Sequence, residues 1–347
     1  MATRSMLDVL AQWWWLAVDW FSAHAVAPAL AALHLGNLLG DPQDIAFALL
    51  TGFVQIAIVA CVFRPLEAFA PADAWRDGKL TWVDLRFTFV LVVFSPLLAF
   101  LVLSPFANLF GGMLDRLGVP ADGLLNHIPR IQEHPYLAFG IYYAANDLAY
   151  YWMHRAQHAI PWWWALHSMH HSQRQVNCWT NSRVSWLDVV IESCLLATVG
   201  LVMGVDVGQF AVLVLLTQLV QDLAHTNTRL GFGRYLDRLI VDPRFHRQHH
   251  WLPDPSQPPL PDCNFGQVLS IWDNLFGTAR YVRATRASGV GDAMIDADNH
   301  HGMLAMQWFC LRRFVGAFTR RAGWKPQFVS FDGKYRPVPV PADVDAS

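Results

Sequence analysis

Charged side chains are scarce in this chain of 347 residues. Asp, Glu, Lys and Arg make up 15% of it, whereas ordinary soluble domains carry about 25%. Apolar residues make up 54%, and the chain contains 16 Trp and 22 Phe. The formal net charge is −2 at pH 7, so nucleic acid is not an expected partner. The composition therefore predicts a membrane protein.

Several cofactor and metal motifs are missing from the sequence. The five cysteines form no CxxC pair and their number is odd, which argues against a disulfide framework and against a thiolate metal site. There is no HExxH, so that class of metalloprotease is excluded. No GxGxxG opens a βαβ unit and no CxxCH is present, so no flavin, nicotinamide or c-type haem module is visible. Electrons for any redox reaction would have to come from another protein.

Glutamate is much rarer than aspartate, and its positions argue against two further classes of metal site. The chain has only Glu67, Glu133 and Glu192, and none belongs to an ExxH pair. The soluble di-iron bundle with carboxylate ligands is therefore excluded. A zinc-dependent hydrolase would need a general base, typically Glu, close to the metal, and no Glu lies within the histidine-rich segments.

Histidine, in contrast, is concentrated. Neutral imidazole is the commonest metal ligand among side chains, and a spacing of three or four residues places two rings on one face of a helix. A catalytic zinc takes about three protein ligands, so nine histidines predict more than one ion. Imidazole suits Zn, Cu, Fe and Ni alike. The four groups are His154 and His158; His167, His170 and His171; His225 alone; and His246, His249 and His250.

The single His225 has no histidine neighbour at the spacing of the other groups. A lone histidine is often a satisfied core residue, and spacing alone leaves both interpretations open for it.

Long apolar segments predict membrane-spanning helices, each of which needs about 20 mostly apolar residues. Residues 13–35 are a weaker candidate, either a first span or an interfacial helix. The predicted spans 187–203 and 207–221 are each short, and together they form either a re-entrant or a tilted hairpin. The predicted spans are 45–63, 87–103 with a kink at Pro96, 136–153, 187–203 and 207–221.

The distribution of arginine predicts the orientation. Arginines lie between the first two spans and beside the histidine groups, and the positive-inside rule assigns such segments to the cytoplasm. All four histidine groups then fall on one side, just beyond helix ends. We expect an all-α, integral membrane helical bundle with a cytoplasmic helical cap that carries the histidine di-metal site, in a bacterial inner membrane.

Two aromatic segments suggest contact with the membrane surface. Residues 307–324 form an amphipathic pattern with four arginines, which suits a helix on an anionic membrane surface or a helix packed on the catalytic domain. The run Trp162–Trp164 indicates a membrane interface.

The ordered motifs resemble those of the fatty acid hydroxylase / sterol desaturase superfamily. The resemblance covers roughly residues 85–282, and residues 171–180 are more similar to bacterial members. It divides the chain into N-terminal membrane helices (1–84), a catalytic domain (85–282) and a C-terminal cytoplasmic tail with an amphipathic helix (283–347). The motifs are DLAYYWMHRAQH at 147–158, HSMHHS at 167–172, HRQHH at 246–250, NFG at 264–266 and IWDNLFGT at 271–278.

The resemblance implies a function and a ligand set. Members of this superfamily are integral membrane enzymes that use a di-iron centre, O2 and external electrons to hydroxylate or desaturate lipid C–H bonds. It implies that the nine histidines are the iron ligands, and that a ferredoxin- or cytochrome b5-like donor with an NAD(P)H reductase supplies electrons. Some fatty acid hydroxylases have a further histidine four residues beyond the match of His225. Here that position is Arg229, so the tenth ligand is missing, or replaced by water or Asn227.

Four aspartates are candidates for orienting the histidines, because ligating histidines usually donate their other N–H to a carboxylate or carbonyl. Asp147, Asp222 and Asp242 precede a histidine of the groups by seven, three and four residues, and Asp273 is a further candidate. A helix cap or a surface charge is the alternative for each of them.

Other functions remain open at this point. A metal transporter would favour ligands at mid-membrane within broken helices, and a zinc-dependent membrane hydrolase is a third possibility.

Overall fold

The computed structural model describes residues 6–36, 41–74, 78–120, 122–204, 207–252, 262–282 and 286–319. Helices account for the regular structure of these residues, and β-pairing among them is limited to two isolated bridges. The expected all-α fold is confirmed.

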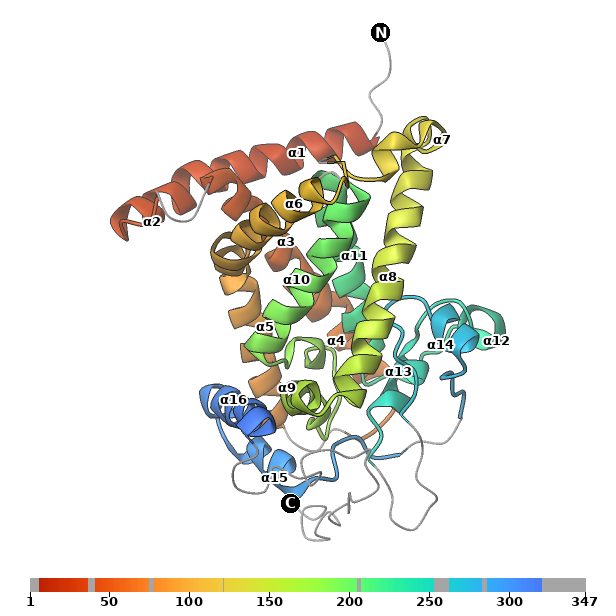
Figure 1. Cartoon of the computed structure of the whole chain (residues 1–347). Coiled ribbons are helices and arrows are strands. Elements are labelled where there is room, and N and C mark those ends of the chain that lie inside the picture. Colours follow the sequence, from red (N-terminus) through yellow and green to blue (C-terminus); the bar gives the residue numbers. More distant parts are fainter. Residues whose placement is uncertain are drawn as a thin grey trace.

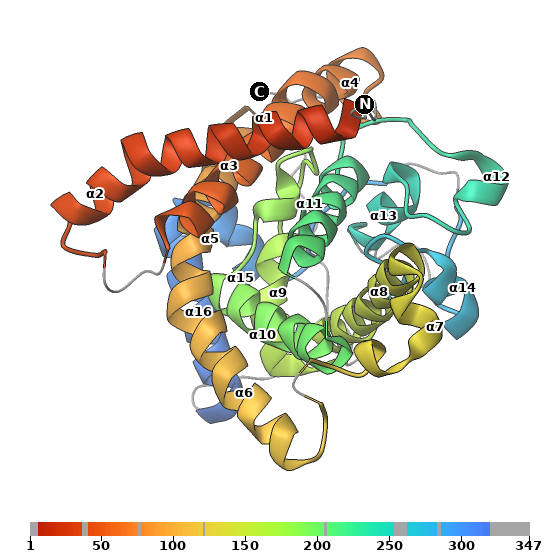
Figure 2. The same cartoon turned by 90° about the horizontal axis from the view of Figure 1, so that it is seen from above.

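The bundle is formed by helical segments whose longest helices run along the length of the molecule (Figure 1). Seen from above, α8, α10 and α11 lie on one side of the bundle and α3 and α5 on the other (Figure 2). These segments are α3 (Pro42–Ile58) continued by η2 (Val59–Phe63) and α4 (Arg64–Phe69), α5 (Gly78–Leu98) continued by η3 (Ala99–Leu103) and α6 (Ser104–Arg116), α8 (Pro135–Ala159), α10 (Trp186–Met203) and α11 (Val207–Ala224).

Among the described residues, three helices are long and apolar enough to cross a membrane, namely those at 42–69, 78–98 and 186–203. They contain the predicted spans 45–63 and 187–203 and the greater part of 87–103, and the integral membrane bundle is therefore confirmed. The predicted span 136–153 lies within α8, which continues beyond it to carry the first histidine pair. In α11 the apolar part of the described helix is shorter, Leu213–Ala224.

Two local features let α3 and α5 pack as long helices. A Cβ on Gly52 would lie 2.4 Å from Cγ1 of Val92, so only glycine permits this approach of α3 to α5. Pro96 lies inside α5 and has no N–H for the carbonyl one turn earlier. The hydroxyl of Ser95 donates to that carbonyl, the oxygen of Val92, at 2.9 Å. The helix continues through the proline at which a kink was expected.

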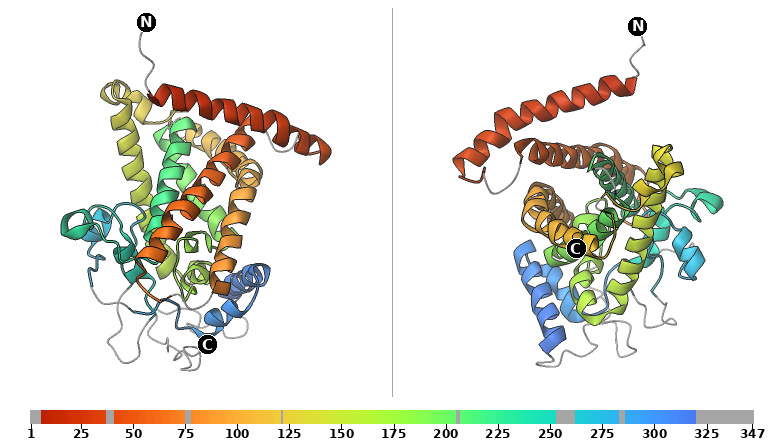
Figure 3. Two further views of the ribbon diagram at one scale, coloured as in Figure 1. Left: turned by 180° about the vertical axis from the view of Figure 1, so that it is seen from behind. Right: turned by 45° about the horizontal axis from the view of Figure 1, so that its top comes forward.

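The first helical segment lies across one end of the bundle, opposite α16 (Figures 1 and 3). It consists of α1 (Met6–Phe21), η1 (Ser22–Val26) and α2 (Ala27–Ala32). Val18, Val26 and Leu30 pack on the start of α3, whereas Trp13 and Trp20 are exposed. This placement favours an interfacial helix over a span for residues 13–35.

The other end of the bundle carries a cap of shorter helices. The main ones are α9 (Pro161–His171), α13 (Pro243–His249) and α16 (Met303–Thr319). Figure 1 shows α9 and α13 beside the last turns of α8, with α16 on the outside. The other short helices on this side are η5 (Thr180–Ser182), α12 (Gly233–Leu236), α14 (Ile271–Phe276), α15 (Ala293–Asp296) and η6 (Ala297–His300). The short helices η4 (Leu125–His127) and α7 (Pro129–Gln132) precede α8, and α7 lies at the opposite end of the bundle, near α1 (Figure 1).

Helix α16 has two apolar faces. Met306 and Cys310 are fully buried against Leu166 and Met169 of α9, as expected for a helix packed on the catalytic domain. The other face exposes Leu304, Trp308, Leu311, Val315 and Phe318. Residues 320–324 of the predicted segment lie outside the described residues.

The expectation for the tryptophan run is wrong for two of its residues. Trp163 and Trp164 are 6% and 4% exposed, so neither lies at a membrane surface. The Trp163 indole donates to Asp188 at 2.7 Å, and the Trp164 ring lies 5.0 Å from that of His158. Both tryptophans are part of the wall of the histidine site.

Candidate metal centre

All nine histidines of the sequence motifs meet at the cap end of the bundle. They form two groups, and within each group the facing ligand atoms lie within 4.8 Å of one another. Each side chain is at most 8% exposed. His225, which spacing left undecided, belongs to the second group. The first group is His154, His158, His167, His171 and His249, and the second is His170, His225, His246 and His250.

Helix geometry explains how the two HxxHH elements are divided. Consecutive residues of a helix point about 100° apart, so neighbouring rings face different groups. The planes of the His170 and His171 rings are inclined at 87° to each other, and those of the His249 and His250 rings at 89°. Each element therefore gives an i, i+4 pair to one group and its remaining ring to the other. Helix α8 adds two rings to the first group, and His225 adds one to the second.

The ring nitrogens inside the groups are oriented toward each other. In the second group, Nε2 of His225 lies 3.1 Å from Nε2 of His170 and 2.9 Å from Nε2 of His246. In the first, Nε2 of His171 lies 3.2 Å from that of His167. Buried nitrogens are normally hydrogen-bonded, yet the Nε2 atoms of His154, His158 and His249 have no hydrogen-bond partner among the described residues. Converging, unpartnered imidazole nitrogens are suited to bind metal ions.

Backbone carbonyls fix three of these rings from behind. Nδ1 of His154 is 2.8 Å from the carbonyl oxygen of Phe265, and Nδ1 of His249 is 2.7 Å from that of Cys263. Nδ1 of His225 is 2.7 Å from the oxygen of Gln221. A carbonyl can only accept, so each Nδ1 carries the proton, and the Nε2 lone pair faces the group.

Burial also lowers the pKa of several of these rings. Desolvation lowers the pKa of His249 to about 3 and that of His225 to about 4. The pKa values of His170, His171, His246 and His250 lie well below the usual value for the same reason, with a further contribution from neighbouring histidines. At neutral pH these imidazoles are therefore in the form that binds a metal.

The four predicted aspartates bind the scaffold that holds the histidines. Asp147 accepts from the amides of residues 268 and 269 and from the Trp272 indole. Asp242 caps α13, the helix of the third motif, by accepting from the amide of Phe245. Asp222 accepts from the side chains of Gln55 and Asn181.

Asp273 acts through the backbone. It accepts from the amides of Phe265 and Gly266 at 2.8 Å, and the carbonyl of Phe265 in turn accepts from His154. Its carboxylate therefore fixes the backbone unit that orients a histidine ring.

Asp188, which was not among the predicted aspartates, is the carboxylate that lies closest to the outer nitrogen of a ring in the first group. Its Oδ2 lies 3.4 Å from Nδ1 of His167. It also accepts from Gln157 and Trp163. Asp188 follows His167 by twenty-one residues and lies on α10, so no helical spacing relates the two. In the sequence, the one indication of a role for Asp188 was its position near the start of a predicted span.

A buried ion pair fixes the loop between α9 and α10. Nη1 of Arg183 lies 3.0 Å from Oδ1 of Asp84, and both side chains are fully buried. The same carboxylate accepts from the side chains of Gln173, Asn177 and Thr180. The boundary predicted between residues 84 and 85 thus falls inside α5, and the three-part division stays a prediction.

Asn227 and Arg229, the residues considered in connection with the missing tenth ligand, bind other parts of the chain. The Asn227 side chain accepts from the amide of Asp73 and from Arg247, and donates to the carbonyl of Asp73. Arg229 donates to the carbonyl of Pro71. The second group therefore consists of four histidines, one fewer than the first.

The comparisons with known proteins agree with this site. Residues 139–278 match the family model described as fatty acid hydroxylase. This part of the chain is therefore similar to fatty acid hydroxylase domains. The matched segment contains all nine histidines and lies within the predicted catalytic region 85–282.

Curated relatives bear names of lipid-oxidising enzymes. Alkylglycerol monooxygenase of Danio rerio is 33% identical over 132 residues, which are 38% of this chain and 28% of the relative. Ornithine lipid hydroxylase OlsE of Rhizobium tropici is 27% identical over 132 residues, 38% of each chain. A Delta(7)-sterol 5(6)-desaturase of Gibberella zeae is 25% identical over 140 residues, 40% of this chain and 41% of the relative. The chain thus spans well under half of each relative's length. No solved structure matches it.

Proposed function

We propose that this protein is a membrane di-iron oxygenase that uses O2 and external electrons to hydroxylate a C–H bond of a lipid. The observation that carries the proposal is the pair of adjacent, buried histidine groups with five and four members. Support comes from the fatty acid hydroxylase match over the same segment and from relatives named monooxygenase and hydroxylase.

The donor set fits two ions of a borderline metal. Its ligand atoms are all imidazole nitrogens, which suit iron, zinc and copper but not magnesium or calcium. His154, His158, His167, His171 and His249 would hold one ion, and His170, His225, His246 and His250 the other. When bound, two irons would supply the activation of O2 and the oxidation of the C–H bond.

The chain's own contribution is to hold the rings and exclude water. Backbone carbonyls and Asp188 fix the orientation of four of the nine rings. The rings of Phe265 and Trp164 lie 5.3 and 5.0 Å from that of His158. An apolar wall of this kind keeps bulk water from the reacting centre.

The proposed substrate is a membrane lipid, and hydroxylation is favoured over desaturation. The three kinds of relative carry names that point to alkylglycerols, ornithine lipids and sterols. Two of these kinds are named for oxygen insertion and one for desaturation. A panel of candidate substrates for an activity assay should therefore begin with these three lipid classes.

Electron supply and orientation belong to the same proposal. A ferredoxin- or cytochrome b5-like donor with an NAD(P)H reductase would deliver electrons to the cap. The histidine end would face the cytoplasm of a bacterium, at the inner membrane. Labelling of a single cysteine placed at the exposed His301 with a membrane-impermeant reagent tests this. Labelling of intact spheroplasts would contradict a cytoplasmic cap.

Metal analysis combined with O2 uptake tests the central proposal. The purified protein should contain two irons per chain, and reduced protein should consume O2 only when a lipid substrate is present. The product should carry one oxygen atom from ¹⁸O2. Stoichiometric zinc in protein from native membranes, with no O2 uptake on any lipid of the panel, would instead support the hydrolase or transporter alternative.

A further inference from the structure

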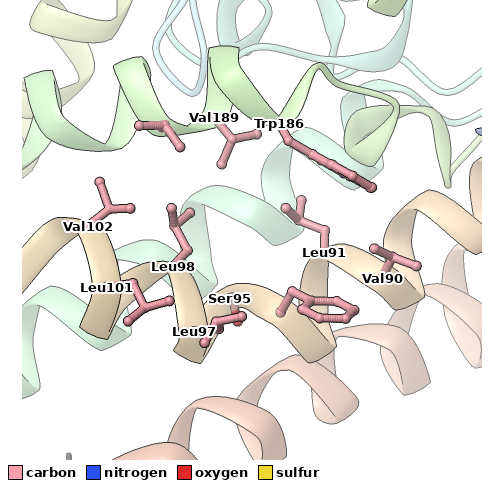
Figure 4. A pocket seen from close by; sticks show the side chains of 11 residues that line it. Val90, Leu91, Ser95, Leu97, Leu98, Leu101, Val102, Trp186 and Val189 are labelled. Atoms are coloured by element: carbon pink, nitrogen blue, oxygen red, sulfur yellow. The ribbon is translucent and has the colours of Figure 1, made fainter. Parts of the chain in front are cut away.

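An apolar groove of about 370 Å³ lies between α5 with η3 and the first turn of α10. Figure 4 shows Trp186 and Val189 of α10 facing side chains of α5 across this space. The groove is separate from the histidine groups. Its lining residues include Val90, Leu91, Phe94, Leu98, Leu101 and Val102.

The chemistry of the lining selects a hydrocarbon. Ser95 and the Trp186 indole are its polar side chains, and the Ser95 hydroxyl already donates to the carbonyl of Val92. Trp186 lies at one end of the groove, beside Leu91 and Val90, while Val102 lies toward the other end (Figure 4). Between these ends the occupant meets only apolar side chains, so a polar headgroup would lose its hydrogen bonds there.

The position of the groove gives lipid access. Both walls belong to helices long and apolar enough to span a membrane, and water is absent from the bilayer core. Phe94 and Leu101 are 54% and 56% exposed, so the groove adjoins the surface that faces the bilayer. A lipid chain can therefore enter sideways without crossing a polar layer.

One end of the groove lies near residues of α5 and α10 that contact the helices of the histidine site. Phe87, one turn before Val90 on α5, packs on Leu166 and Met169 of α9, the helix of the second histidine motif. On α10, Asp188 follows Trp186 by two residues and lies 3.4 Å from Nδ1 of His167. From Val90 to Val102 the helical rise amounts to about 18 Å. A chain in the groove therefore has one end near α9 and the other end, the deep end, beside Val102.

We propose that this groove binds the alkyl chain of the lipid substrate and that its deep end, at Leu98 and Val102, limits chain length. The inference rests on the proposed lipid oxygenase function and assigns the part of the protein that selects the substrate's chain. We commit to a hydrocarbon chain of a bilayer lipid as the occupant, because the lining is almost entirely apolar and adjoins the surface that faces the bilayer.

Filling the deep end tests the proposal. In Val102→Trp the indole would occupy the far part of the groove. The matched control is Leu195→Trp, which places the same indole on the lipid-exposed side of α10, outside the lining. With lipids of one headgroup and graded chain length, Val102→Trp should raise KM for the longest chains by about tenfold, because even one or two methylenes in an apolar pocket discriminate this strongly. Short chains should be unaffected, and the iron content should stay at the wild-type level.

Photocrosslinking supplies a readout that does not depend on activity. A lipid with a diazirine near the chain terminus should label α5 or α10 peptides of the groove in wild-type protein, and this labelling should fall in Val102→Trp but not in Leu195→Trp. Identical chain-length profiles and labelling in all three proteins would overturn the proposal. If the wild-type protein oxidises no lipid but groove labelling follows this pattern, the proposed oxygenase function fails while the groove remains a lipid-chain site.

Discussion

Adjacent histidines on α9 and α13 serve different groups, so single residues have separable roles. His170 and His171 are neighbours in sequence, yet His170 faces His225 and His171 faces His158 and His249. Each substitution should therefore affect one group first.

Removing His170 should disable the four-histidine group. His170→Ala leaves three of its four rings, and we expect loss of one of the two ions together with abolished O2-dependent product and nearly normal expression. Iron content and product formation measure this. The matched control, His134→Ala, removes an exposed histidine outside both groups and should retain both ions. Unchanged turnover in His170→Ala would remove this residue from the ligand set.

The carboxylate of Asp188 should matter although it lies behind the ligand. Asp188→Asn loses the charge beside His167 while keeping the shape of the side chain. Loss of such a partner typically lowers metal affinity or activity by about 10- to 100-fold. Competition with a chelator measures the affinity, and Asp115→Asn, at an exposed position on α6, is the control. Equal chelator resistance in both variants would show that Asp188 has only a structural role.

At the scale of elements, α5 and the loop before α10 are joined by the buried pair of Asp84 and Arg183. Arg183 also donates to the carbonyl of Met169 on α9. The pair therefore connects a candidate span to the helix of the second histidine motif. Because both side chains are fully buried, removing one partner leaves an uncompensated charge.

Removing one partner of this buried ion pair should therefore destabilise the folded protein. Arg183→Met should lower the free energy of unfolding by about 3–5 kcal/mol, the usual cost of breaking a buried pair. The double variant Asp84→Asn/Arg183→Met should recover part of this loss. Thermal unfolding in detergent measures both. The partly exposed pair of Arg174 and Asp296 offers the control, since Arg174→Met should cost clearly less. Equal losses for the two single variants would contradict the role assigned to burial.

At the scale of the whole molecule, the cap and the bundle enclose nine buried imidazoles, and the lowered pKa values of several of them make the metal-free protein sensitive to acid. The folded pKa values of His225 and His249, about 4 and about 3, lie below the unfolded value of about 6.5. Below that value the unfolded chain binds more protons than the folded one, so stability falls as pH falls.

The expected result is a loss of thermal stability in metal-free protein between about pH 7 and pH 5. Protein loaded with metal should lose less over the upper part of this range, because bound ions compete with protons for the same nitrogens. Melting curves of both forms at several pH values make the comparison. A melting temperature of the metal-free form that does not change with pH would contradict the burial of neutral rings.

Much of the architecture follows from local sequence. The apolar runs 45–63, 87–103 and 187–203 predict spans, because about 20 apolar residues suffice to cross a bilayer. The candidate spans of the structure, at 42–69, 78–98 and 186–203, overlap these runs. The spacing of His167 and His171, and of His246 and His250, predicts shared helix faces, and each pair does meet in one group. Periodicity within one helix is enough for such predictions.

The sequence by itself determined the type of ligand, the apolar bundle and the helical pairs, because each depends on residues within one or two turns. Only the tertiary structure decided the division into five and four histidines, the inclusion of His225 and the approach of Asp188 to His167. These features join α8, α9, α10, α11 and α13, and their relative positions depend on packing between helices that lie far apart in the sequence. The burial of Trp163 and Trp164 has the same origin, since tryptophan suits a membrane interface and a protein interior equally well.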